Sequence, residues 1–118
     1  MQAVLEATKE VNYEQFPRSN RVDARRVVRT LYSLLDQRDP SDPIERRSRA
    51  GMFFLGTSLL LELRGSDKKD KLHEVVEDMR FHQRFLCDRY EGASFQTQQK
   101  TIGALHCQTH RFLEYLCE

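Results

Sequence analysis

The chain has 118 residues, and a domain of this length buries about two-thirds of its unfolded surface without metal or disulfide support. Hydrophobic residues make up 39% of the chain and charged residues 31%, a composition that argues against disorder and suits helices with one polar face. The formal net charge of +1 argues against a general nucleic-acid binder. We therefore expect one helical-bundle domain over residues 1–118 that needs no cofactor to fold.

The sequence given shows neither of the two patterns typical of membrane-spanning and secreted proteins. It lacks an apolar stretch of about 18 residues, and its N-terminus lacks the charged head and apolar middle of a secretory signal. Its three cysteines, Cys87, Cys107 and Cys117, are an odd number without CxxC spacing. We expect a cytoplasmic protein without a membrane partner, in which these are buried or half-buried free thiols.

Two helices are expected in the first third of the chain. The first covers residues 3–14 and ends at Phe16-Pro17, because the residue before a proline is pushed out of the α region. The second covers residues 20–37, with Ser19 or Asn20 as its N-cap. Its apolar residues recur at spacings of three and four, which indicates one buried face: Ala24, Val27, Val28, Leu31, Leu34 and Leu35.

A third helix begins after the clearest turn of the chain, at residues 39–43. Asp42 is placed as its N-cap, Pro43 in its first turn and Glu45 at the third position, which together form a strong helix start. Residues 51–61 are apolar on nearly every side of this helix. Such a segment is typical of the centre of a bundle or of an oligomer interface.

Two glycines interrupt the apolar half of the third helix. Gly51 and Gly56 each lower helix propensity by about 1 kcal/mol relative to alanine. We expect them to allow a neighbouring helix to approach closely. Gly65-Ser66 then ends the helix.

Two further helices complete the expected fold. The fourth runs to Tyr90 and is stopped by Gly92, and the fifth is capped by Ser94 and ends near Leu116. Strand signals are absent from the sequence, because Val, Ile and Thr are sparse and no Asn-Gly or Asp-Gly turn joins alternating runs. We expect an all-α fold, a compact bundle of four to five helices that forms an oligomer.

Arginine is the most informative polar residue of this chain. Residues 18–50 hold nine arginines, no lysine and five acids, which gives that segment a charge of +4 and the remainder −3. Planar guanidinium groups suit phosphate, since each can donate two hydrogen bonds to one anion. The alternative is a solvated face that nearby acids partly neutralise. The candidate residues for binding nucleic acid or another anion are Arg18, Arg21, Arg25, Arg26, Arg29, Arg46, Arg47 and Arg49.

Catalytic and metal-binding patterns are weak in this sequence. His106, His110 and Glu114 recur every four residues along one face of the fifth helix, but a metal site needs further ligands from elsewhere. Cys107 next to His106 does not form a nucleophile and base pair, because sequence neighbours on a helix point about 100° apart. The common catalytic and phosphate-loop motifs are missing. We expect no enzyme, no catalytic residues and no metal.

One short segment resembles a known family. Phe16-Pro17-Arg18-Ser19-Asn20-Arg21, between the first and second helices, resembles the Phe-Pro-(Lys/Arg)-Ser-x-Arg entry of a small four-helix-bundle family. That family includes the proteins encoded in ribosomal RNA intervening sequences and the accessory variability proteins of diversity-generating retroelements. The resemblance implies a basic homo-oligomer, often a pentameric barrel, that binds nucleic acid and a reverse transcriptase. It would carry over Arg18 and Arg21 as basic-surface residues and nothing catalytic.

Three functional hypotheses follow from these observations. The first is a non-catalytic interaction subunit or adaptor that assembles with itself or a larger complex, supported by the apolar residues 52–61 and by Phe81 and Phe85. The second is a nucleic-acid-binding accessory subunit of a ribonucleoprotein that uses the arginines. The third is a metal-dependent enzyme on His106, His110 and Glu114. We rank them in that order.

Overall fold

The computed structural model describes residues 10–65 and 69–118. Over these residues the chain forms four α-helices and two 3-10 turns, without a strand. The all-α expectation is confirmed, and the number of helices in the described residues is four. The helices are α2 (Arg21–Asp36), α3 (Pro43–Arg64), α4 (Lys71–Asp88) and α5 (Phe95–Leu116).

The segment before α2 is tied to the end of α5. Most of the first expected helix, residues 1–9, lies outside the described residues, and Tyr13–Gln15 forms a 3-10 turn instead of continuing an α-helix. Asn12 competes for the backbone here, since its side chain accepts a hydrogen bond from the Glu14 amide. The Leu116 carbonyl accepts two hydrogen bonds, from the Asn12 amide at 3.0 Å and from the Gln15 side chain at 2.9 Å.

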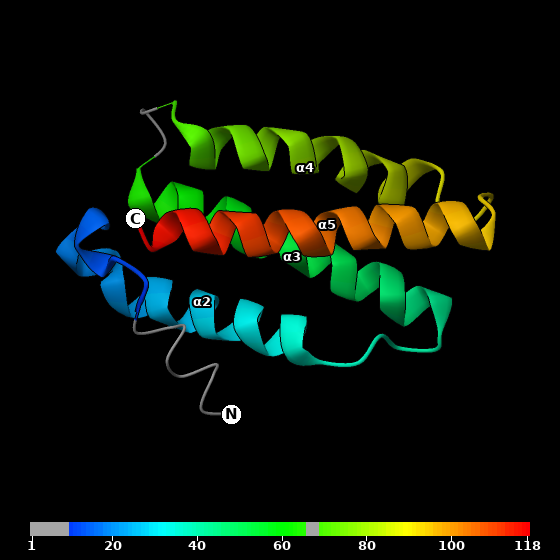
Figure 1. The fold of residues 1–118 in the computed structure, drawn as a ribbon, viewed down its shortest axis with the longest axis horizontal. Coiled ribbons are helices and arrows are strands. Elements are labelled where there is room, and N and C mark those ends of the chain that lie inside the picture. Colours follow the sequence, from blue (N-terminus) through cyan, green and yellow to red (C-terminus); the bar gives the residue numbers. More distant parts are fainter. Residues whose placement is uncertain (1–9, 66–68) are drawn as a thin grey trace.

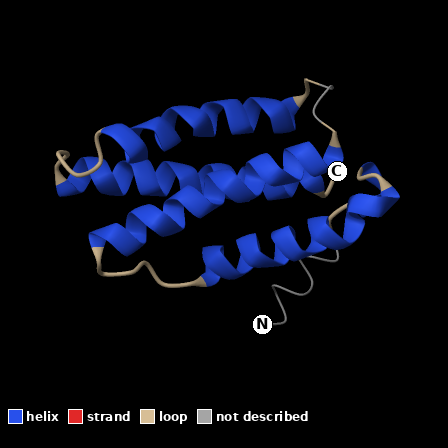
Figure 2. Ribbon diagram, turned by 180° about the vertical axis from the view of Figure 1, so that it is seen from behind, coloured by secondary structure: helices blue, strands red, loops and turns tan. Residues whose placement is uncertain are grey.

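The four helices run alternately up and down the bundle, as Figure 1 shows. Helices α3 and α5 lie in the middle, with α4 on one side and α2 on the other. The reverse view in Figure 2 shows the same order, with the connections at the two ends of the bundle. The principal extents are 44 × 33 × 20 Å. None of the helices in the described part of the chain combines the length and apolar character needed to cross a bilayer.

Each helix contributes one apolar face to a continuous core. The three largest fully buried side chains are Phe16, Phe53 and Phe112. Burial of a side chain of this kind stabilises the fold by about 1.5–3 kcal/mol, so these three rings are a substantial part of the core. On α2 the buried residues Ala24, Val28 and Leu31 lie on the apolar face expected from the sequence. Smaller buried residues of the other helices complete the core: Leu60, Val76, Met79, Leu86, Leu105 and Leu113.

The ends of the helices follow local hydrogen bonds. Asp42 caps α3 and Ser94 caps α5 through the Ile44 and Thr97 amides, at 3.1 and 3.2 Å, so both expected caps are confirmed. Gly65 ends α3 with φ of 104°, a conformation that favours glycine. Helix α4 is capped by Asp70, whose side chain accepts from the His73 amide, and it ends at Asp88, two residues before the expected Tyr90.

Only one of the two glycines of α3 lies at a close helix contact. A Cβ atom on Gly56 would be 2.6 Å from Leu31 Cδ2 and 3.1 Å from Leu31 Cγ, so α2 packs directly on this position. A Cβ atom on Gly51 would meet the Gln83 side chain at 3.8 Å, an ordinary contact distance. The expected close approach is therefore confirmed at Gly56 and absent at Gly51.

Candidate interaction surfaces

Arg49 on α3 bonds to the connection between α2 and α3. Its side chain is buried, and Nη1 donates to the carbonyls of Gln37 and Arg38, each at 3.0 Å. Nη2 pairs with Asp39 Oδ1 at 2.5 Å. The guanidinium thus satisfies two carbonyls of the connection that follows α2.

Two other arginines at the start of α3 are also engaged within the molecule. Arg46 is buried, donates to the Ser41 carbonyl at 2.8 Å and stacks on the Phe95 ring, with Cζ 5.2 Å from its centroid. Arg47 forms an ion pair with Glu91 at 3.3 Å. The sequence grouped Arg46 and Arg49 with the candidate anion-binding arginines, but in the structure both side chains are buried and bond within the molecule.

The arginines before and within α2 divide into two groups. Arg21 is half-buried and donates to the carbonyls of Phe16 and Glu14 at 3.1 and 3.4 Å, so it stabilises the turn before the helix. Four other arginines are exposed, and no carboxylate in the described part of the chain lies within ion-pair distance of them. We call these four the basic face: Arg18, Arg25, Arg26 and Arg29.

Two tyrosines lie close to the basic face. Arg25 covers the ring of Tyr13, with Cζ 4.8 Å from the centroid, so this guanidinium is already partly ordered. Tyr32 packs against the core, and burial raises its pKa to about 12. The basic face therefore presents guanidinium groups with little freely exposed aromatic surface.

A shallow apolar groove of about 280 Å³ lies between α2 and α3. Its α3 side is formed by Met52, Leu55 and Leu59, which are 42, 62 and 42% exposed. Leu31 and Gly56 lie along its floor, where the two helices touch, and Arg26 is the one charged residue of its lining. We call this feature the apolar groove.

The outer side of α4 carries a second exposed apolar feature. Phe81 is 74% exposed, and the half-buried Phe85 lies one turn further along the same side. Arg84, Asp88 and Arg89 line a hollow beside these two rings. The expectation of an exposed Phe81 is confirmed, whereas Phe85 packs partly against the core.

The two histidines on one side of α5, His106 and His110, pack against each other. The rings of His106 and His110 are 5.1 Å apart, and His106 also packs edge-on against Phe53. Burial lowers the pKa of His110, and the neighbouring His106 lowers it further. Within residues 10–65 and 69–118, no three side chains of the metal-binding types gather at one point.

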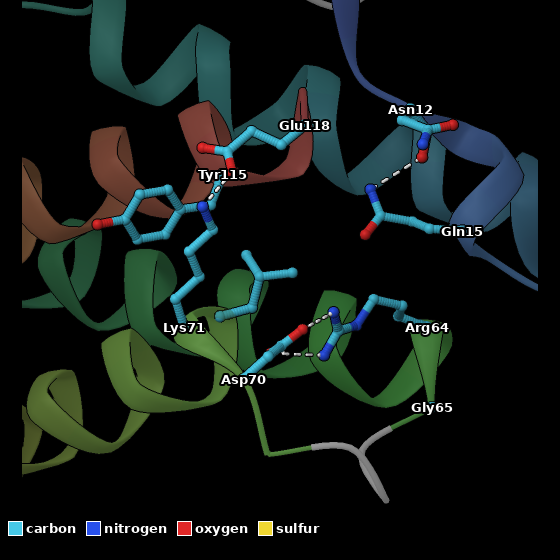
Figure 3. Close-up of a pocket in the computed structure, with 9 residues that line it drawn as sticks. Asn12, Gln15, Arg64, Gly65, Asp70, Lys71, Tyr115 and Glu118 are labelled. Atoms are coloured by element: carbon cyan, nitrogen blue, oxygen red, sulfur yellow. Dashed lines mark hydrogen bonds and ion pairs between the residues drawn. The ribbon is translucent and has the colours of Figure 1, made fainter.

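A pocket of about 470 Å³ lies where the C-terminal end of α5 meets the start of α4 (Figure 3). Arg64 forms a two-point ion pair with Asp70 at 2.6 and 3.0 Å. Lys71 bonds Glu118 and lies 4.6 Å from the Tyr115 ring centroid. Each charged side chain of the lining is thus paired with another one. These pairs join α3, α4 and the end of the chain, so we assign the pocket a structural role.

The cysteines differ from the sequence expectation. Cys87 and Cys107 are exposed free thiols, and only Cys117 is half-buried. Both exposed cysteines lie on the polar sides of their helices, because the apolar spacing of α4 and α5 places Leu86 and Leu105 on the buried sides instead. The expectation of buried or half-buried thiols is wrong for these two residues.

Comparison of the chain with known protein families, curated proteins and solved structures identified no match. The candidate surfaces therefore rest on the geometry above.

Sequence reasoning missed that the apolar half of α3 divides into two stripes. Phe53, Thr57 and Leu60 face the core, while Met52, Leu55 and Leu59 face solvent. The signal for this division was present, because residues at i, i+3 and i+7 share one side of a helix.

Proposed function

We propose that this chain is a non-catalytic interaction subunit that binds protein through the apolar groove. The observation that carries this proposal is the exposure of Met52, Leu55 and Leu59 on one side of α3. Contiguous apolar surface of this kind marks interaction sites on folded domains, whereas single exposed apolar residues do not. The groove between two parallel rows of side chains suits an amphipathic helix, which inserts residues one turn apart.

Site-specific crosslinking tests the proposal directly. A photoreactive side chain in place of Leu55 should form a covalent adduct with a protein chain, either a second copy or another protein, which mass spectrometry identifies. The matched control is Ile44, an equally apolar residue of α3 that is 72% exposed and lies outside the groove lining. Adducts at neither position, or equal adducts at both, would contradict the proposal.

We propose nucleic-acid binding as the second candidate function. It is supported by the four exposed arginines of the basic face, and the resemblance at residues 16–21 agrees with it through Arg18. Arg21, Arg46, Arg47 and Arg49 are left out of this proposal because they bond within the molecule. Contacts of this kind reach the phosphate backbone, so little sequence preference is expected.

Salt dependence of RNA binding tests this second candidate. Four phosphate contacts predict that log K falls with log salt with a slope of about −3 to −4. Arg25→Glu with Arg29→Glu should remove most of the binding, whereas Arg84→Glu on α4 should leave it nearly unchanged. Fluorescence anisotropy with a labelled RNA provides the measurement, and equal binding by both variants would discard the idea.

A further inference from the structure

The outer side of α4 carries a projecting ring and, next to it, a hollow. Phe81 is the projecting ring, since it is 74% exposed. Phe85 is half-buried and packs partly against the core, so its ring forms a wall of the hollow. The hollow has a volume of about 280 Å³ and extends from Phe81 to the end of the helix. One side of one helix therefore holds both a ring that can insert and a space that can receive a ring.

The charge along this side of α4 changes sign at Phe81. Three exposed acids precede the ring, namely Glu74, Glu77 and Asp78. The hollow that follows the ring has two arginines and one acid in its lining. Glu77 pairs with Arg80 at 3.4 Å, whereas Asp78 and Arg89 have no oppositely charged partner among residues 10–65 and 69–118. The acidic and basic halves are thus available for each other across a contact between two copies.

The outer side of α4 is also accessible to a second copy. Helix α4 packs on α3 and α5 with its other side and forms one edge of the bundle in both ribbon views (Figures 1 and 2). An antiparallel pair of α4 helices places the acidic half of one on the basic half of the other. A parallel pair places like charges together, which disfavours it. The charges therefore select the antiparallel pair, which has two-fold symmetry.

We propose that two copies of this chain pair through the outer sides of their antiparallel α4 helices, with Phe81 of each copy in the hollow of the other. The contact is isologous, because both copies use the same surface and each ring meets a hollow twice across the two-fold axis. Aromatic anchors in pockets supply most of the binding energy of such interfaces. The contact lies across the bundle from the apolar groove, so it does not depend on the proposed function.

The position of the two rings determines which charges meet. If Phe81 faces Phe85 of the second copy, the turn before Phe81 faces the end of the other α4. Asp78 and Arg89 lie on the same flank of the helix, displaced from Phe81 by about 60° and about 80° at about 100° per residue. Equal flanks meet in an antiparallel two-fold pair, so Asp78 of each copy lies opposite Arg89 of the other. Asp88 lies on the other flank, opposite the Glu77–Arg80 pair, which has no net charge.

Exchange of the two charges tests this arrangement. Asp78→Arg and Arg89→Asp each create like-charge contacts at two symmetric places, so each should weaken dimerisation about three- to tenfold. The chain with both substitutions restores opposite charges between the copies and should dimerise within about threefold of the wild type. Phe81→Glu should weaken dimerisation at least about tenfold. The three side chains are exposed, so the variants should fold, which circular dichroism checks. Sedimentation velocity over a concentration series measures the dimerisation.

Each outcome decides for or against the α4 pair. Leu55→Glu alters the apolar groove and leaves α4 intact, so it is the control and should dimerise like the wild type. A double variant as weak as the single ones overturns the antiparallel arrangement. A wild-type chain that stays monomeric, or a Phe81→Glu variant that dimerises like the wild type, overturns pairing through α4. Loss of dimers in Leu55→Glu alone would assign self-association to the apolar groove, which supports the proposed function and overturns this inference.

Discussion

Replacement of Gly56 by alanine tests the closest helix contact of the bundle. The new Cβ atom would lie 2.6 Å from Leu31 Cδ2 and 3.1 Å from Cγ, so rotation of the terminal methyl groups cannot relieve the contact. Leu31 is only 1% exposed, and its displacement disturbs the packing of α2 on α3. Overpacking of this kind costs about 1–3 kcal/mol, against a gain of about 1 kcal/mol from better helix propensity.

Gly103 provides the matched control because it also lies inside a helix. A Cβ atom there has no neighbour within 4 Å, so Gly103→Ala should raise the free energy of unfolding by about 1 kcal/mol. Gly56→Ala should lower it by about 1 kcal/mol, and the two variants should differ by about 2 kcal/mol, or about 8 °C in Tm. Urea denaturation and thermal scans measure both. Equal or greater stability of Gly56→Ala relative to the wild type would refute the reasoning.

Two further predictions concern the charged groups at the ends of the bundle. The Arg64 guanidinium lowers the pKa of Asp70 from 3.8 to about 2. A carboxyl whose pKa is lower in the folded state stabilises the protein above pH 4 and loses this effect as the pH falls toward 2. Asp70→Asn retains a capping side chain, so it should cost about 1 kcal/mol at neutral pH, after allowance for solvent screening, and only a small part of this near pH 2, where half of the folded-state carboxyl is still ionised. Chemical denaturation of the wild type and the variant over a pH series measures this difference. If the ion pair were unimportant, the difference between their free energies of unfolding would not change with pH. Arg49→Lys should lower the free energy of unfolding by about 2 kcal/mol, because an ammonium group cannot reach two carbonyls and Asp39 in the fork geometry. A lysine variant as stable as the wild type would contradict this role.

The helices could be predicted largely from the sequence because their signals are local. Asp42-Pro43 and Ser94 determine where α3 and α5 begin, through hydrogen bonds that span only two or three residues. The end of α4 was predicted two residues too late, at Tyr90 instead of Asp88. Tyr90 lies beyond the helix, where it is buried and donates to the Pro43 carbonyl at 3.2 Å. Such a contact is invisible in the spacing of α4 alone.

The arginines show why the candidate site was harder to predict than the fold. Spacing places Arg25 and Arg29 correctly on the outer side of α2, because position on a helix is a local property. It cannot reveal that Arg46 and Arg49 turn inward, since their acceptors are carbonyls of the preceding connection. At Arg46 and Arg49 the structure gives a physical reason for arginine over lysine, because each buried side chain donates more than one hydrogen bond.

The hydrogen bonds that join Asn12 and Gln15 to the Leu116 carbonyl link two parts of the chain that are far apart in sequence. The last turn of α5 cannot fray without releasing the segment that carries Phe16, a fully buried ring. Both parts should therefore open as one cooperative unit. In native-state hydrogen exchange, the amides of Asn12 and of the final turn of α5 should share one opening free energy and one dependence on denaturant.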